Sequence, residues 1–151
     1  MLNFVIIVTL TIKFNCVKKS FICKLQITKT KHIWCTARIN GKNAVLLIDT
    51  GASSSCIHSE LQEHYKLIIR GESFDAAGAS AGKMKATLTS KCKLDLGKEF
   101  AGKHAFVLLD LNHVNQTLQS QGARKIDGIL GADFLKRKKA VIDYGQRMLF
   151  F

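Results

Sequence analysis

The sequence has no proline, few acidic residues and no long apolar run. Among its 151 residues, 11 are Asp or Glu and 23 are Lys or Arg, which gives a formal net charge of +12. No stretch approaches the roughly 20 apolar residues that a helix needs to span a bilayer. A strong basic charge keeps a protein soluble and attracts anions, but it does not identify a binding partner. Because no linker, low-complexity segment or repeat divides the chain, its length predicts a single domain.

Metal-binding patterns are missing as well. The five cysteines are odd in number, and none belongs to a C-x-x-C pair or to a Cys/His zinc spacing. The histidines form no H-E-x-x-H pattern, so no metal site is expected. We therefore expect reduced thiols in a reducing compartment, mostly buried as small apolar side chains.

Residues 1–20 form an apolar extension ahead of a domain at residues 21–151. The apolar run at residues 4–12 has no Lys or Arg before it and no small-residue cleavage site after it. Two interpretations stay open: an extra strand or loose extension, or a signal peptide or membrane anchor. We expect a cytoplasmic protein, with a periplasmic or membrane-associated one as the alternative if residues 4–12 anchor the chain.

The only dense basic run is KRKK at residues 136–139. Such a run is typical of a solvated helix face, and less often of a nucleic-acid patch. A nucleic-acid binder would need clustered Lys and Arg together with exposed aromatic side chains. No nucleic-acid partner is therefore expected.

Short apolar runs and frequent turn signals predict a mostly β domain with two or three short helices. Asn40-Gly41 between two apolar runs predicts a hairpin. The strands are expected at residues 21–28, 32–39, 44–48, 83–96, 106–109, 141–144 and 148–151. The helices are expected at residues 59–65, with Ser59 as N-cap, and at residues 112–121 and 132–138. Residues 126–131 (IDGILG) are expected to form a tight apolar turn.

One stretch at residues 73–83 (SFDAAGASAGK) is rich in Gly, Ala and Ser. A glycine-rich tip between two extended arms is how a lid is built. A plain surface loop has the same composition, so both interpretations stay open here.

The most informative stretch is VLLIDTGASSS at residues 45–55. Asp49-Thr50-Gly51 follows an aliphatic run that is typical of a strand buried on both faces. This pattern, with Ile129-Leu130-Gly131 before a later short helix, resembles the retropepsin-like aspartic proteases, the small homodimeric relatives of pepsin that include the retroviral proteases. The AAGAS stretch and the C-terminal DGILGADFLKRKKAVIDYGQRMLFF are similar to the bacterial retropepsin-like proteins in particular.

The resemblance covers about residues 21–151. It implies a closed β-barrel acid-protease fold with one lobe in each chain. It also implies that Ile129, Leu130 and Gly131 form a ψ-shaped crossing beside the catalytic turn. The activity implied is that of an aspartic endopeptidase.

Peptide hydrolysis needs a base that activates water and an acid that protonates the leaving group, and two carboxylates sharing one proton supply both. When they are about 3 Å apart they cannot both ionise, so one stays protonated. This chain has one Asp-Thr-Gly, and a pepsin with two lobes needs roughly twice this length. The simplest solution is a C2 homodimer in which Asp49 meets its counterpart in the partner. No cofactor is expected, because two carboxylates and a water suffice.

The neighbours of Asp49 can be given roles. Gly51 allows a close backbone approach, and its N–H can favour a charged carboxylate. By the resemblance, Thr50 hydrogen-bonds across the dimer axis. Ala52 is small enough for an extended substrate to pass, and Ser53 stands where retroviral enzymes have an aspartate that contacts the substrate backbone.

Gly78 and Ala79 are the candidates for the flap tip, whose backbone would hold an extended peptide as an added strand. By contrast, we interpret Asp127 and Asp143 as turn residues without a catalytic role.

Two other classes of function deserve comparison with a protease. An ATPase of the actin and sugar-kinase type would need far more chain, and no G-x-x-x-x-G-K-[ST] pattern is present. A catalytically inactive retropepsin-fold dimer could instead serve as a peptide- or protein-binding module. The intact Asp49-Thr50-Gly51 favours the enzyme.

Overall fold

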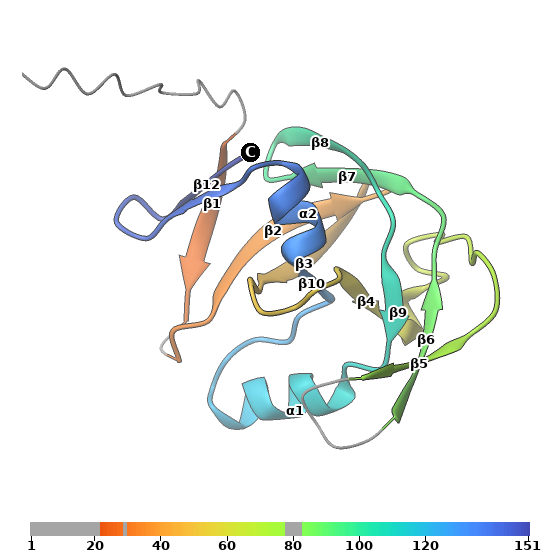
Figure 1. The fold of residues 1–151 in the computed structure, drawn as a ribbon. Helices are drawn as coiled ribbons and strands as arrows, with labels where there is room; N and C mark the ends of the chain where they lie inside the picture. The colour runs from red at the N-terminus through yellow and green to blue at the C-terminus, as the bar shows by residue number, and fades with distance from the viewer. Residues whose placement is uncertain (1–21, 29, 78–82) are drawn as a thin grey trace, which may run out of the picture.

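The computed structural model describes residues 22–28, 30–77 and 83–151, which form one mostly β domain (Figure 1). Its strands are β1 (Ile22–Ile27), β2 (Ile33–Ile39), β3 (Lys42–Ile48), β4 (Cys56–His58), β5 (Phe74–Ala77), β6 (Lys83–Leu88), β7 (Cys92–Leu96), β8 (Glu99–His104), β9 (Val107–Leu109), β10 (Gly128–Leu130), β11 (Val141–Asp143) and β12 (Met148–Phe150). The helices are the 3-10 turn η1 (Ser59–Leu61), α1 (Asn112–Ser120) and α2 (Ala132–Arg137). No helix in the described ranges is long and apolar enough to cross a membrane.

The hydrogen-bonded strands follow the order β11-β12-β1-β2-β3-β10-β4-β9-β6-β5. Strand β7 lies outside this path and pairs with both β2 and β8. This path leaves β11 and β5 as two separate ends, so the expected closed barrel is wrong. Strand β6 pairs with β9 only through its last two residues, Thr87 and Leu88, whereas its first four residues pair with β5 in a separate arm. One mostly β lobe with short helices is otherwise confirmed.

The hairpin at the centre of the sheet forms as its sequence predicts. Asn40 and Gly41 both have positive φ, at 48° and 84°, which is the conformation of a type I′ turn. The turn sets a register of seven paired residues between β2 and β3. That register buries Cys35, Ile39 and Leu46 completely.

The main core lies under this hairpin and is covered by α2. Phe134 and Leu135 of α2 are buried in it with side chains from β1, β2, β3, β7 and β12. All four cysteines in the described residues, Cys23, Cys35, Cys56 and Cys92, are free and buried, as the sequence predicts. A smaller apolar cluster of Leu47, Leu118 and Ile126 fixes α1 against the opposite face of β3.

Three local expectations are wrong. Residues 59–65 form only the short turn η1, and its N-cap is His58 rather than Ser59. Residues 83–96 are not one strand, because Thr89 turns inward and its hydroxyl accepts a hydrogen bond from the Phe106 N–H at 2.9 Å. Residues 126–131 are not simply a turn, since Gly128–Leu130 is strand β10.

Candidate active site

Asp49 is the first residue after β3, and its backbone and side chain are both held in place. Its N–H donates to the carbonyl of Leu130 at 3.1 Å. Its carboxylate Oδ1 accepts a hydrogen bond from the Gly51 N–H at 2.8 Å, within the turn itself.

Strand β10 lies between the two strands that flank the Asp49 turn. It runs parallel to β3, with Ile129 opposite Leu47, and antiparallel to β4, with Ile129 opposite Cys56. The chain therefore leaves β3, passes through the Asp49 turn and returns as β4, while β10 fills the gap between them (Figure 1). This is the ψ-shaped arrangement, and it places residues 129–131 beside Asp49.

Two glycines make this close packing possible. A Cβ on Gly128 would lie 2.3 Å from the carbonyl oxygen of Cys56. A Cβ on Gly131 would lie 2.8 Å from the carbonyl oxygen of Ala52 and 2.8 Å from the carbonyl carbon of Ser54. Backbone atoms at these distances cannot give way as a flexible side chain would, so a larger residue at position 128 would displace β4, and one at position 131 would displace the segment that follows Asp49.

The segment after the Asp49 turn is also bound to the start of α2. The N–H groups of Ala132 and Asp133 donate to the carbonyls of Ala52 and Ser53 at 2.8 and 3.2 Å. The hydroxyl of Ser55, which is fully buried, donates to Asp133 Oδ1 at 2.6 Å. The sequence patterns predict no role for Ser55 or Asp133. The signals that could have pointed to them are the run of three serines at residues 53–55 and an acidic residue in the first turn of a short helix.

The tip of the turn faces outward. Thr50 and Gly51 are exposed, Asp49 and Ala52 are partly buried, and Ser53 is exposed. The Thr50 hydroxyl makes no hydrogen bond within the described part of the chain. The site is therefore supported from the core side and open on the other side.

Cys56, the first residue of β4, is the thiol next to this turn. It is 4% exposed, and burial raises its pKa to about 11, with smaller contributions from Asp133 and Asp49. A thiolate is the nucleophilic form of cysteine, so Cys56 is inert at neutral pH. The Asp49 carboxylate is therefore the candidate for chemistry at this turn.

Asp127 and Asp143 both hold backbone in place, as the sequence interpretation proposed for turn residues. Asp127 Oδ2 accepts from the Val45 N–H at 2.7 Å. Asp143 Oδ1 accepts from the Gln146 N–H at 2.8 Å. Among the described residues, no group of three or more His, Cys, Asp or Glu side chains is arranged to hold a metal ion.

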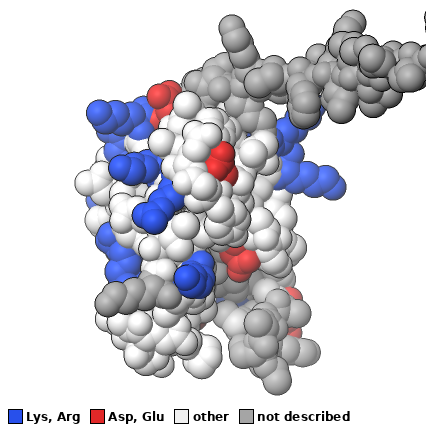
Figure 2. All heavy atoms as spheres, turned by 90° about the vertical axis from the view of Figure 1, so that its left-hand side faces the viewer, with Lys and Arg blue, Asp and Glu red and all other residues white. Residues whose placement is uncertain are grey.

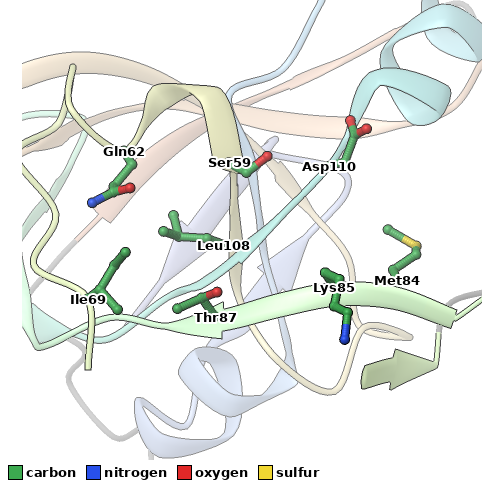
Figure 3. A pocket seen from close by; sticks show the side chains of 8 residues that line it. All are labelled: Ser59, Gln62, Ile69, Met84, Lys85, Thr87, Leu108 and Asp110. Atoms are coloured by element: carbon green, nitrogen blue, oxygen red, sulfur yellow. The ribbon is translucent and has the colours of Figure 1, made fainter. Parts of the chain in front are cut away.

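The β5–β6 pair forms the two arms expected beside a flap, but Gly78 and Ala79 lie outside the described residues. A hollow of about 470 Å³ lies between these arms and the body of the domain (Figure 3). Its lining residues come from η1, β6 and β9 and from the loops next to them: Ser59, Gln62, Ile69, Met84, Lys85, Thr87, Leu108 and Asp110. The lining residues Ser59 and Asp110 directly follow His58 and Leu109, which are paired between the parallel strands β4 and β9. The hollow therefore lies at the His58 end of β4, whereas the Asp49 turn lies at the Cys56 end.

Basic side chains do not gather into one patch on the face that Figure 2 shows, where Lys and Arg are scattered among neutral residues. The run at residues 136–139 begins within α2 and is largely exposed, as expected for a solvated helix face. Arg137 is exposed too, but its guanidinium lies over the ring of Phe134 and contacts His104.

Comparison with known proteins agrees with this geometry. The family model described as aspartyl protease matches residues 35–134. The retroviral protease-like domain of Ddi1 from Leishmania major has a similar structure, with 17% identity, 85% of this chain and 88% of that chain covered, and a TM-score of 0.56.

Two further solved structures share the fold. The EIAV protease, complexed with the inhibitor HBY-793, is 19% identical over 78% of this chain and 98% of its own, with a TM-score of 0.52. A retropepsin-like aspartic protease from Rickettsia conorii is 19% identical over 85% of this chain and 87% of its own, with a TM-score of 0.51. No curated protein matches the sequence. The family match and the shared fold agree with the Asp-Thr-Gly turn and its ψ-shaped crossing, and the chain belongs to the aspartyl protease family with a retropepsin-like fold.

Proposed function

We propose that this chain is an aspartic endopeptidase whose active site forms between two copies. The observation that carries the proposal is the Asp49 turn, which its own domain holds from one side and leaves open on the other. One copy supplies one Asp-Thr-Gly, so the second carboxylate comes from the partner by C2 symmetry. Thr50 is exposed and its hydroxyl has no hydrogen-bond partner within the described chain, so it is free to bond to the second copy.

The reaction follows from two such carboxylates. The ionised Asp49 takes a proton from a water held between the two side chains, and the oxygen of that water attacks the carbonyl carbon of the peptide bond. The protonated Asp49 of the partner subunit gives its proton to the carbonyl oxygen, which yields a neutral tetrahedral diol. The C–N bond then breaks as the nitrogen takes a proton from the first carboxyl group and a hydroxyl of the diol gives its proton to the other carboxylate, so the products are a carboxylic acid and an amine and the pair is again singly protonated.

The substrate is an extended peptide or protein segment. The β5–β6 arms carry edge backbone that can pair with an extended strand, and a strand added in this way is bound through main-chain hydrogen bonds. Ala52 and Ser53 beside the turn are the proposed contacts from the floor of the site, and Gly78 and Ala79 the proposed contacts from the flap.

The test is cleavage of a peptide library by the wild type and by Asp49→Asn, across several pH values. Asp49→Asn should abolish cleavage without loss of folding or dimerisation, because an amide keeps the shape of the turn but cannot take a proton from water. Asp143→Asn, a change of the same kind in a distant turn, should retain full activity. Sedimentation at falling concentration measures the dimer directly.

Full activity in Asp49→Asn, or a wild-type protein that stays monomeric at high concentration with substrate, would overturn the proposal. A dimer that binds peptides without cleaving them at any pH would instead establish the binding module.

A further inference from the structure

A polar network behind the Asp49 turn, buried at Ser55 and His104 and exposed at Asp133 and Arg137, is not used by the proposed reaction. Its members come from three separate parts of the chain: Ser55 between the turn and β4, His104 at the end of β8, and Asp133 and Arg137 on α2. Ser55 is fully buried and His104 is 3% exposed. Buried polar groups of this kind are costly unless their partners are in place.

Asp133 binds the turn segment through a single oxygen. Its Oδ1 accepts from the Ser55 hydroxyl at 2.6 Å, from the Ser55 N–H at 3.0 Å and from the Phe134 N–H at 2.7 Å. The Ser55 hydroxyl accepts in turn from the Gly131 N–H at 2.9 Å. Because a carboxylate only accepts, the direction of each bond is fixed.

The second oxygen of Asp133 faces a histidine. His104 Nε2 lies 3.4 Å from Asp133 Oδ2 and is buried without a hydrogen bond in the described structure. On the other side of the ring, Arg137 Nη2 lies 2.9 Å from His104 Nδ1. Since a guanidinium only donates, Nδ1 must accept, and the neutral ring therefore carries its proton on Nε2.

We infer that Asp133, His104 and Arg137 form a positioning network that holds the Asp49 turn in place through Ser55, and that this network requires a carboxylate rather than an amide at position 133. This inference rests on the proposed function for its effect on catalysis. An asparagine at position 133 could still accept a hydrogen bond from the Ser55 hydroxyl with its amide oxygen. Its NH₂ group would then take the place of Oδ2 and face the Nε2–H of His104, so two hydrogen-bond donors would face each other. The ring cannot turn its proton to Nδ1 while Arg137 donates there.

The network thus links the side chain at position 133 to Arg137, one turn further along α2, through the ring of His104. Asp133, His104 and Arg137 are positioning residues, because none of them is proposed to touch the peptide. Loss of the carboxylate should loosen Ser55 and Gly131 and shift the Asp49 turn. A misplacement of about 1 Å can reduce a rate by about 100-fold.

The test compares the full-length dimer of wild type with Asp133→Asn, using Asp143→Asn as the matched control. Nitrogen NMR of the imidazoles should show His104 in the wild type with the proton on Nε2. Amide hydrogen exchange at Ser55 and Gly131 should be at least about 10-fold faster in Asp133→Asn and unchanged in the control. Where the protein cleaves peptides, kcat should fall by about 10- to 100-fold in Asp133→Asn with little change in KM.

A double variant separates this network from a general loss of packing. Arg137→Met frees Nδ1, so in the Asp133→Asn background the ring can move its proton to Nδ1 and accept from the amide with Nε2. The double variant should therefore exchange more slowly at Ser55 than Asp133→Asn alone, although it carries one more substitution.

Three results would overturn the inference: a wild-type His104 with its proton on Nδ1, unchanged exchange in Asp133→Asn, or a double variant that exchanges as fast as the single one. A wild type that cleaves no peptide would remove the proposed function alone. The NMR and exchange measurements would still decide whether the network exists.

Discussion

The domain should lose stability as the pH falls from 6.5 toward 4, because His104 is buried in its neutral form. Burial lowers the pKa of His104 from 6.5 to about 4. The Asp133 carboxylate opposes this lowering of the pKa, and the charges of Arg137 and Lys91 add to it. Between these two pH values the unfolded chain binds a proton at this residue and the folded chain does not, so acid favours unfolding.

The size of the effect follows from the same two values. Each pH unit between the folded and unfolded pKa corresponds to about 1.36 kcal/mol. A pKa lowered from 6.5 to about 4 therefore costs the folded state about 3 kcal/mol once the pH is below 4. The cost is absent above pH 6.5 and develops progressively between the two values.

Urea unfolding at fixed protein concentration, followed from pH 7 to pH 4, measures this loss. His104→Gln removes the titrating ring but keeps a polar side chain, so its stability should fall by about 3 kcal/mol less than that of the wild type over the same range. His113→Gln, at an exposed position on α1, should behave like the wild type. If wild type and His104→Gln lost stability in parallel, the neutral burial of His104 would be refuted.

Two further predictions concern packing and the buried tyrosine. Gly131→Ala should lower the free energy of unfolding, measured in urea, by about 1–3 kcal/mol, because the new methyl group would meet backbone of the Asp49 turn. Gly145→Ala is the control: the nearest contact of its methyl group is a side-chain oxygen at 3.4 Å, so the free energy of unfolding should change by less than about 0.5 kcal/mol. Equal losses in the two variants would contradict the close approach at Gly131. Tyr144→Phe leaves Tyr65 as the remaining phenol, and burial, followed by the nearby Asp127, raises the pKa of Tyr65. Tyr65 should therefore ionise only as the protein unfolds at alkaline pH, which phenolate absorbance measures. A reversible phenolate signal from the folded protein would contradict this burial.

Local signals in the sequence were enough to place the Asp49 turn and much of the sheet. A run of aliphatic residues before Asp49 predicts a buried strand, and Asn40-Gly41 predicts the tight hairpin that sets its register. Both signals lie within about ten residues of the structure they determine, so no tertiary information is needed. The helices at residues 112–121 and 132–138 are predicted equally well, each within one residue of its end.

The parts that sequence reasoning missed depend on contacts between distant residues. Strand β10 is three residues long and contains a glycine, so alone it resembles a turn. It becomes a strand because β3 and β4 pair with it on both sides. Asp133, His104 and Arg137 meet only after β8 packs against α2, and no spacing rule for metals or catalytic groups describes that contact.

The Asp49 turn has the geometry that the proposed two-copy site needs. Leu130 and the start of α2 hold the backbone of this turn from the core side, whereas Thr50 and Gly51 remain exposed. If the turn only closed a strand crossing, its exposed side would need no particular residues, and the Thr50 hydroxyl would have no use. A turn fixed rigidly on one side and open on the other is what the proposed two-copy site requires, since the second carboxylate must approach from the open side. The missing half of the chemistry is therefore expected from a second copy of the same turn.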